Sequence, residues 1–389
     1  MIEIEEALEL ILSNKTMLDK ISVDLMDALG FVLAEDVHSP IHLPSFSQSA
    51  MDGYAICGEQ NQFEIKGIIK AGDTSSYSLK NGECYRIFTG AKVPENTTSI
   101  AKQEIVKVVD HQIILQETVK SGTSIRLKGE ELAKDEVAIL KGTKINSAAI
   151  GLLAGLGKES VKIYRKPKIS IIVTGDELIK LGNDLPSGKI YESNSFTLRS
   201  ALKSNGFEAE IQHVEDDFER TKSTIDSAIQ NNDVVILSGG ISVGDYDFVG
   251  KAVEELQVEK VFYKINQKPG KPMYHGLKDG AKIFALPGNP AAALTCYYFY
   301  VLPAIQLMAG ETNNGLQKVS ARLSASFLKK GDRAFLLKAQ ISKGTVTIHK
   351  GQSSAMLSSF VNANCLLYLK KGSREYQKND EVEVFLIPQ

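Results

Sequence analysis

The spacing of apolar residues changes several times along the chain and divides it into regions of different predicted structure. Near the amino terminus the spacing is helical, which places four residues on one face: Ile4, Leu8, Ile11 and Leu12. A second helix is predicted over residues 23–33. Residues 63–140 instead contain short β-rich runs separated by Gly, Asn and Pro, which predicts a small β domain.

Between residues 166 and 310, short apolar runs alternate with amphipathic helical segments. Runs such as ISIIVT and VVIL are apolar throughout, which is typical of parallel strands that are buried on both faces. This region is therefore predicted to be a doubly wound, mostly parallel α/β domain. From about residue 318 the pattern is again that of short strands, which predicts a small closed barrel or a sandwich.

The predicted fold class is thus multi-domain, α/β plus β. Four regions are expected: an elongated amino-terminal region of residues 1–45 and 130–165, an inserted small β domain of residues 46–129, the central α/β domain of residues 166–312, and a carboxyl-terminal β domain of residues 313–389. A length of 389 residues fits several domains better than one core.

The composition is that of an ordinary globular protein. Apolar residues make up 43%, charged residues 24%, and the formal net charge is −2, which argues against disorder and against a dedicated nucleic-acid binder. The four cysteines lie far apart without metal-ligand spacing, so a reduced, cytoplasmic compartment is expected. The amino terminus is acidic where a secretory signal would be basic.

One segment, residues 291–308, is almost long and apolar enough to span a membrane. It contains Pro303, follows a loop directly and has no charged residues at either flank. A helix packed inside an α/β layer has the same pattern, and we expect a core helix here and no membrane association.

Polar residues and glycines follow three of the predicted central strands. The carboxyl ends of parallel strands meet at one edge of a sheet, and ligands bind outside that edge. The three stretches are Thr174-Gly175-Asp176-Glu177, the loop Ser238-Gly239-Gly240-Ile241-Ser242-Val243-Gly244-Asp245-Tyr246-Asp247, and Pro287-Gly288-Asn289-Pro290.

These residue types suit phosphoanhydride chemistry. Glycines let backbone N–H groups approach a ligand, and a helix amino terminus favours an anion. The carboxylates of Asp176, Glu177 and Asp247 are hard oxygen ligands of the kind that Mg²⁺ prefers. Lys268 and Lys271 lie in a proline-stiffened turn and are cations that neutralise an oxyanion. Taken singly, each stretch is also explained as a tight turn or a helix cap.

The motifs, taken together and in order, resemble the MoeA family, to which the gephyrin E domain belongs. The resemblance covers essentially the whole chain. Besides the central motifs and the turn of residues 268–272, it rests on Ser49-Ala50-Met51-Asp52-Gly53-Tyr54-Ala55, Phe88-Thr89-Gly90-Ala91, Arg126-Leu127-Lys128-Gly129-Glu130-Glu131, and the run from Gly351 to Ser359 that includes Ser353.

The resemblance implies a molybdopterin molybdenumtransferase. Such an enzyme binds adenylated molybdopterin, takes up molybdate, splits the phosphoanhydride with Mg²⁺ and releases AMP. It further implies a homodimer with its site between the central domain of one subunit and the amino-terminal region of the other. Molybdopterin adenylyltransferase and downstream maturation proteins of molybdoenzymes are further possible partners.

The resemblance also assigns roles to residues. Asp176, Glu177 and Asp247 are expected to handle metal and phosphate, and Lys268 and Lys271 to hold an oxyanion. Asp52, Thr89 and Arg126 are expected to act from the second subunit, and Asp216 and Asp217 form a second-tier acidic pair. The expected cofactor-binding set is Thr89, Arg126, Thr174, Gly175, Ser238, Gly239, Gly240, Ser242, Gly244, Pro287, Gly288, Asn289, Pro290 and Ser353.

The chain departs from the family pattern in three places. A second glutamate, Glu131, replaces an aspartate; Ala291 and Ala292 follow the Pro290 turn where many members carry a serine; and Leu337-Lys338 stands where a second arginine often follows Arg333. Two alternative functions remain open at this point: an adenylyltransferase-like enzyme on the same central domain, and a non-catalytic scaffold like the gephyrin E domain.

Overall fold

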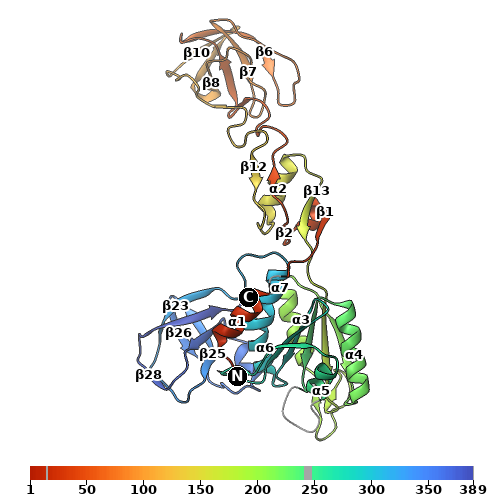
Figure 1. Cartoon of the computed structure of the whole chain (residues 1–389). Helices are drawn as coiled ribbons and strands as arrows, with labels where there is room; N and C mark the ends of the chain where they lie inside the picture. Colours follow the sequence, from red (N-terminus) through yellow and green to blue (C-terminus); the bar gives the residue numbers. More distant parts are fainter. Residues whose placement is uncertain (15, 241–247, 389) are drawn as a thin grey trace.

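The computed structural model describes residues 1–14, 16–240 and 248–388. A central α/β domain and a carboxyl-terminal β barrel lie side by side, and an extended arm leads from them to a separate β domain (Figure 1). The predicted fold class is confirmed.

The central domain is built on a six-stranded sheet. Its strands, in spatial order, are β17 (Glu210–Val214), β14 (Ile169–Thr174), β18 (Val234–Ser238), β22 (Ala281–Leu286), β21 (Tyr274–Lys278) and β19 (Glu259–Tyr263). The first four are parallel, whereas β21 and β19 run antiparallel at one edge. All residues of β14 and β18 are buried, as their continuous apolar pattern predicts.

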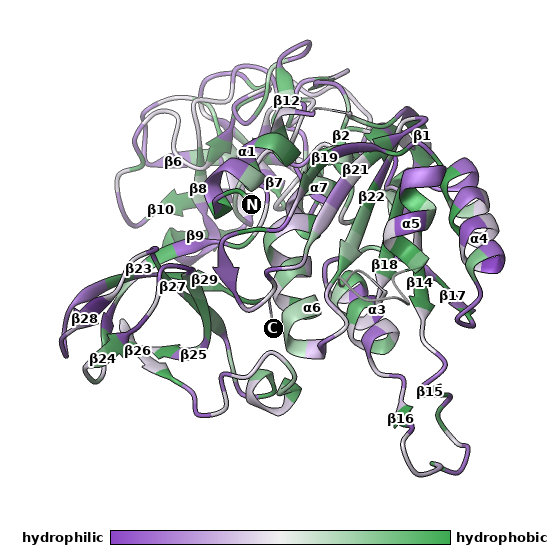
Figure 2. Ribbon diagram, turned by 60° about the horizontal axis from the view of Figure 1, so that its bottom comes forward, coloured by the Kyte–Doolittle hydropathy of each residue, from purple (hydrophilic) through white to green (hydrophobic). Residues whose placement is uncertain are grey.

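Helices cover both faces of this sheet. One face packs against α3 (Asn194–Ser204) and α6 (Pro290–Cys296), and the other against α4 (Phe218–Asn231) and α5 (Phe248–Glu255). Between β14 and α3, the short strands β15 (Leu178–Ile179) and β16 (Ile190–Tyr191) form a parallel pair in a loop that projects from the body (Figure 2). The chain runs from β14 to β17 on one side of it and then back to β18 on the other side. The strand order therefore reverses between β14 and β18, which is the switch point of the sheet.

The long apolar segment is a core helix, as expected. Helix α6, a π-helical turn η3 (Tyr297–Val301) and α7 (Leu302–Met308) run on without a break. Residues 290–308 are long and apolar enough to span a membrane, but 94% of their apolar stretch is buried inside the protein. Helix α1 (Ile4–Ser13) packs its apolar face on η3 and α7, so it lies on the central domain and not with the arm.

The arm contains several short strands. A three-stranded sheet joins β1 (Lys20–Asp24), β13 (Ser160–Tyr164) and β2 (Val32–Leu33), and helix α2 (Ser147–Gly155) and the 3-10 turn η1 (Leu25–Ala28) pack beside it. Two further pairs are β3 (Val37–His38) with β12 (Val137–Ile139) and β4 (Gln48–Ser49) with β11 (Ile125–Arg126). The helix predicted over residues 23–33 is wrong, because β1 and β2 pair with β13 from a distant part of the chain.

The inserted β domain lies at the far end of the arm (Figure 1). Its six-stranded sheet has the order β8 (Ser99–Lys102), β5 (Gly53–Ile56), β7 (Glu83–Ile87), β6 (Gln62–Ile69), β10 (Gln112–Leu115) and β9 (Val106–Val109), with the 3-10 turn η2 (Gln103–Ile105) between β8 and β9. Two small apolar clusters on opposite sides of the sheet fill the domain.

The carboxyl-terminal domain is a closed barrel of five strands: β25 (Ala334–Ser342), β26 (Thr345–Ile348), β23 (Lys318–Leu323), β29 (Glu381–Leu386) and β27 (Cys365–Leu369), with β25 pairing back onto β27. Strand β20 (Gln267–Lys268) adds to β25 and ties the barrel to the central domain. A side ribbon of β24 (Phe327–Lys329) and β28 (Arg374–Tyr376) and the 3-10 turn η4 (Leu357–Phe360) complete the domain.

Candidate active site

Three loops at the carboxyl edge of the central sheet pack against one another. A Cβ atom on Gly239 would lie 2.9 Å from the carbonyl oxygen of Thr174, and one on Gly288 would lie 3.8 Å from Cα of Gly239. Gly239 and Gly240 also have φ values of 100° and 61°, which residues other than glycine rarely adopt. The close approach of the loops therefore requires glycine, and the structure brings Thr174, Gly239, Gly240 and Gly288 together.

Backbone donors are available at this edge. Within the described part of the chain, the N–H groups of Gly239, Gly240, Gly288 and Asn289 donate no hydrogen bond. Asn289 precedes helix α6, whose first residue is Pro290, as the sequence predicts. Free N–H groups at strand ends and at a helix amino terminus form a positive environment that favours a phosphate or another oxyanion.

Two carboxylates lie together where β14 and β17 end. The N–H of Asp216 donates to Oδ1 of Asp176 (2.9 Å), and the N–H of Asp176 donates to Oδ2 of Asp216 (3.2 Å). Each side chain keeps its other oxygen free of hydrogen bonds within the described residues. By contrast, Asp217 caps helix α4 by accepting from the N–H of Arg220 (2.8 Å), so its contact is structural.

For the other predicted metal ligands, Glu177 and Asp247, the structure gives fewer contacts. A Cβ atom on Gly175 would lie 2.6 Å from Oε2 of Glu177, so the Glu177 carboxylate lies over Gly175. Ser242, Gly244 and Asp247 lie outside the described residues. Among the residues that the structure describes, no group of three His, Cys, Asp or Glu side chains forms a metal site, and the predicted triad with Asp247 stays a prediction.

The predicted lysine turn lies beside helix α6, beyond its first turn. A Cβ atom on Gly270 would lie 2.5 Å from Sγ of Cys296, which shows how tightly the turn packs on the helix. Lys268 is exposed, with Nζ 5.3 Å from the ring centroid of Phe335 in the barrel, and Lys271 is exposed as well. Both cations are thus free to meet an anion at the junction of the two domains.

The barrel contributes a loop at the same junction. Nδ2 of Asn289 donates to Oγ of Ser354 (3.0 Å), and the N–H of Ala292 donates to the carbonyl oxygen of Ser354 (3.1 Å). Sequence reasoning selected Ser353, and the contact with the Pro287–Pro290 turn is made by its neighbour. The motif identified the loop, but only the structure identifies which serine faces the turn.

The predicted residues of the amino-terminal half form their own cluster. Oδ1 of Asp52 accepts hydrogen bonds from the N–H (2.8 Å) and Oγ1 (2.7 Å) of Thr89. These bonds hold the pKa of the Asp52 carboxyl below its usual range, and the bond from the backbone N–H contributes most. Arg126 pairs with Glu130 (2.7 Å) and Glu131 (3.4 Å), and the Glu130 hydrogen bond is the main cause of its raised pKa.

These residues lie apart from the sheet edge within one chain. The arm enters the central domain through β13, directly before β14, so it adjoins the amino end of that strand. Figure 1 shows the inserted β domain and the carboxyl edge on opposite sides of the body. The structure therefore groups the predicted site residues into two sets and does not bring the sets together in one copy.

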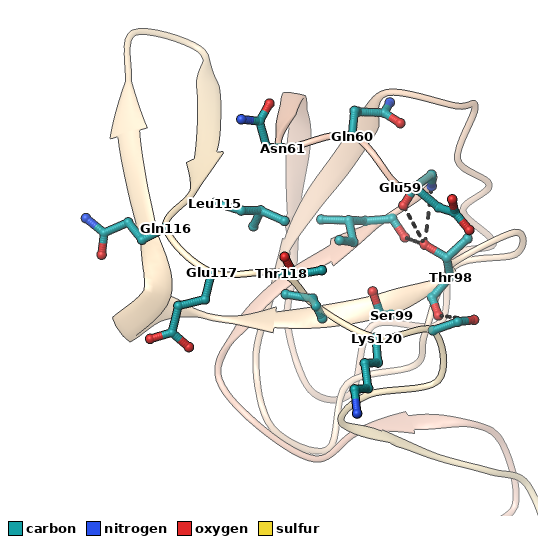
Figure 3. A pocket seen from close by; sticks show the side chains of 14 residues that line it. Glu59, Gln60, Asn61, Thr98, Ser99, Leu115, Gln116, Glu117, Thr118 and Lys120 are labelled. Carbon is teal, nitrogen blue, oxygen red and sulfur yellow. Dashed lines mark hydrogen bonds between the residues drawn. The ribbon is translucent and has the colours of Figure 1, made fainter.

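Several hollows in the described part of the chain lie outside the glycine loops, and two of them bear on the site. One of about 340 Å³ adjoins the site at the ends of β14 and β17, where Asp176, Lys180, Glu192 and His213 line it. A larger one of about 630 Å³ lies in the inserted β domain, lined by polar side chains such as Gln60, Glu117 and Lys120 (Figure 3). No predicted site residue lines the larger hollow.

Comparisons with known proteins agree with this arrangement over the whole chain. Three family models match in order: the MoeA N-terminal region (residues 2–157), a probable molybdopterin binding domain (residues 170–307) and the MoeA C-terminal region (residues 320–387). A molybdopterin molybdenumtransferase of Staphylococcus epidermidis is 30% identical, covering 99% of this chain and 95% of its own length, and one of Staphylococcus aureus has the same identity and coverage.

A solved structure shares the fold from end to end. The molybdopterin biosynthesis MoeA protein of Pyrococcus horikoshii superimposes with a TM-score of 0.85 at 30% identity, over 100% of both chains. A molybdenum cofactor biosynthesis protein of Pyrococcus furiosus superimposes with a TM-score of 0.63 at 20% identity, which supports the fold alone.

Proposed function

This chain belongs to the MoeA family, and from that premise we infer that it is a molybdopterin molybdenumtransferase, an enzyme of molybdenum cofactor biosynthesis. The observation that carries this inference within the molecule is the convergence of the Thr174, Gly239–Gly240 and Gly288 loops at the switch point of the sheet. Its free N–H groups and nearby carboxylates give one edge that accepts an anion and positions hard oxygen ligands.

We propose that the substrates are adenylated molybdopterin and molybdate and that AMP leaves. The N–H groups of Gly239, Gly240 and Gly288 would bind the phosphoanhydride oxygens and hold the bond to be broken at a fixed place. Lys268 and Lys271 would neutralise an oxyanion at the junction with the barrel. Four unpaired cysteine thiols are consistent with a reducing, cytoplasmic location.

Magnesium fits the carboxylates present. Asp176 and Asp216 would hold it, since each keeps one oxygen free after their reciprocal backbone bonds, and Glu177 directly follows Asp176 in the chain. When bound, Mg²⁺ neutralises charge that develops on the phosphoanhydride oxygens. The carboxylates themselves also tie the ends of β14 and β17 together, which keeps the edge rigid.

We further propose that the active enzyme is a homodimer whose site takes Asp52, Thr89 and Arg126 from the partner copy. The supporting observation is that the arm and the inserted β domain, which carry these residues, lie on the opposite side of the fold from the sheet edge (Figure 1). The two hydrogen bonds from Thr89 fix the Asp52 carboxylate and lower its pKa, so Asp52 would act at the cleft as an ionised, oriented metal ligand.

AMP release tests the activity. Purified protein given adenylated molybdopterin, molybdate and Mg²⁺ is expected to release AMP and form active cofactor. Asp176→Asn is expected to lower the rate by about 100-fold, in the range of a lost electrostatic contact in an active site. Asp279→Asn, an exposed aspartate in the turn before β22, is the matched control and should retain full activity. Absence of AMP release by the wild type would overturn the proposal.

Mixing two inactive variants tests the shared site. Asp52→Asn and Asp176→Asn subunits are dissociated and mixed in equal amounts. Half of the dimers that form then contain one subunit of each kind, and each of these mixed dimers has one intact site. Activity is then expected to recover to about one quarter of the wild type. No recovery, with mixed dimers shown by mass spectrometry, would place the complete site within a single chain.

A further inference from the structure

Asn194 is a residue of the site that the motifs do not single out. It is the first residue of α3, directly after the projection formed by β15 and β16. The carboxylate of Glu192, only 2% exposed, accepts a hydrogen bond from the N–H of Ser195 (2.8 Å) and so fixes the first turn of the helix. The position of Asn194 at the sheet edge is therefore set by a buried contact on either side of it.

The amide nitrogen of Asn194 links two of the three converging loops. Nδ2 donates to Oγ of Ser238 (3.0 Å) and to the carbonyl oxygen of Gly288 (2.8 Å). The opposite orientation of the amide would place two carbonyl oxygens against each other, so the hydrogen bonds assign which atom is nitrogen. Both amide hydrogens are used, and this side chain adds a link between the ends of β18 and β22, which already pair in the sheet.

The amide oxygen of Asn194 is left without a partner. Oδ1 is buried and accepts no hydrogen bond from the described part of the chain. A buried acceptor without a donor is uncommon, because its lost hydration is not replaced. At the edge where the free N–H groups of Gly239 and Gly240 lie, such an atom is suited to accept a hydrogen bond from a ligand.

We propose that Asn194 is a substrate-binding residue: its amide nitrogen clamps the Ser238 and Gly288 loops, and its amide oxygen accepts a hydrogen bond from an N–H or O–H group of the substrate. An anion does not suit this atom, because two acceptors repel. The site is thereby divided into a part that binds phosphate through backbone N–H groups and a part that recognises a neutral donor. The identity of the substrate, adenylated molybdopterin, rests on the proposed function.

The donor belongs either to the adenylate half or to the pterin half of that substrate, and binding of the separate halves distinguishes them. We would measure the dissociation constants of AMP and, under anaerobic conditions, of molybdopterin for the wild type and for Asn194→Ala. The half that carries the donor is expected to bind at least about tenfold more weakly to the variant, as for a buried hydrogen bond. The other half should lose less than about threefold.

Two further variants separate binding from a structural role. Ser238→Ala removes one bond of the clamp and leaves the Asn194 oxygen in place, so it should weaken binding less than Asn194→Ala does. Asn231→Ala, on the surface of α4, should bind both halves like the wild type. If Asn194→Ala does not fold, Asn194→Ser provides the same comparison with a residue that tolerates a helix start.

The outcomes are distinct. Two results would overturn the inference. One is that Asn194→Ala and Ser238→Ala weaken binding equally, and the other is that folded Asn194→Ala binds both halves within about twofold of the wild type. Failure of the wild type to release AMP overturns the proposed function instead, and the affinities for the two halves still decide the role of Asn194.

Discussion

The barrel loop that meets the sheet edge is held by a buried ammonium group, and Lys338→Met tests its importance. Lys338 lies on β25 and is 1% exposed. Its Nζ donates to the carbonyl oxygens of Gly351 (2.9 Å), Ser353 (3.1 Å) and Met356 (3.0 Å). All three hydrogens are thus used, and the loop they hold is the one whose Ser354 contacts Asn289. Burial lowers the pKa of Lys338.

The stability that Lys338 contributes is the difference between its hydrogen bonds and the cost of burying its charge. Each hydrogen bond from a charged group stabilises by about 1.5–3 kcal/mol, so three contribute roughly 5–9 kcal/mol. Burial of the ammonium costs several kcal/mol, which leaves a net stabilisation of about 3 kcal/mol. Methionine fills similar space but donates nothing, so the three carbonyl groups lose their partner. For a domain of about 70 residues, this lowers the melting temperature by about 10–20 °C.

Differential scanning calorimetry of the full chain, with proteolysis to follow the loop, checks this estimate. The transition of the barrel should move down, and residues 351–359 should be cut faster than in the wild type. Lys350→Met, an exposed lysine next to the loop, is the control and should shift neither measurement. A melting temperature of Lys338→Met within about 2 °C of the wild type would refute the reasoning.

Three other predictions concern the sheet, the glycine loop and Asp52. Burial lowers the pKa of Lys282 to about 8 from a usual 10.5, so the unfolded chain binds more protons between these values and wild-type stability rises with pH there. The melting temperature of the wild type relative to that of Lys282→Met should therefore rise from pH 7.5 to 10, and a constant difference would contradict the assignment. Gly239→Ala should weaken AMP binding at least about tenfold, measured by calorimetry, because its Cβ would meet the Thr174 carbonyl oxygen at 2.9 Å; unchanged binding would exclude this loop. Thr89→Val removes one donor and should raise the pKa of Asp52 in an NMR titration, while the backbone bond keeps it below the usual value.

Sequence patterns predicted the elements whose signals are local. The apolar runs of β14 and β18 each lie within a few consecutive residues, and both strands were correctly placed. The structure of residues 23–33 was predicted wrongly, because their strands form only through pairing with β13, more than a hundred residues later. Strand β21 was also not anticipated, since His275 and Gly276 interrupt its apolar pattern.

The site divides in the same way. Glycines and carboxylates after strands were visible because topology alone brings strand ends to one edge. Asn194 and Ser354 were not, because their importance lies in contacts with Ser238, Gly288 and Asn289 from other elements. Lys338 was noted only as a departure from a family pattern, and its role follows from three carbonyl groups that surround it.

The central claim is that the carboxyl edge of the central sheet binds the adenylated substrate. A crystal structure of the protein with AMP, molybdate and Mg²⁺ tests it most directly. We expect the AMP phosphate within hydrogen-bond distance of the N–H groups of Gly239, Gly240 or Gly288, beside Asp176. Nucleotide found only in another hollow, such as that of the inserted β domain, with none at this edge, would contradict the account.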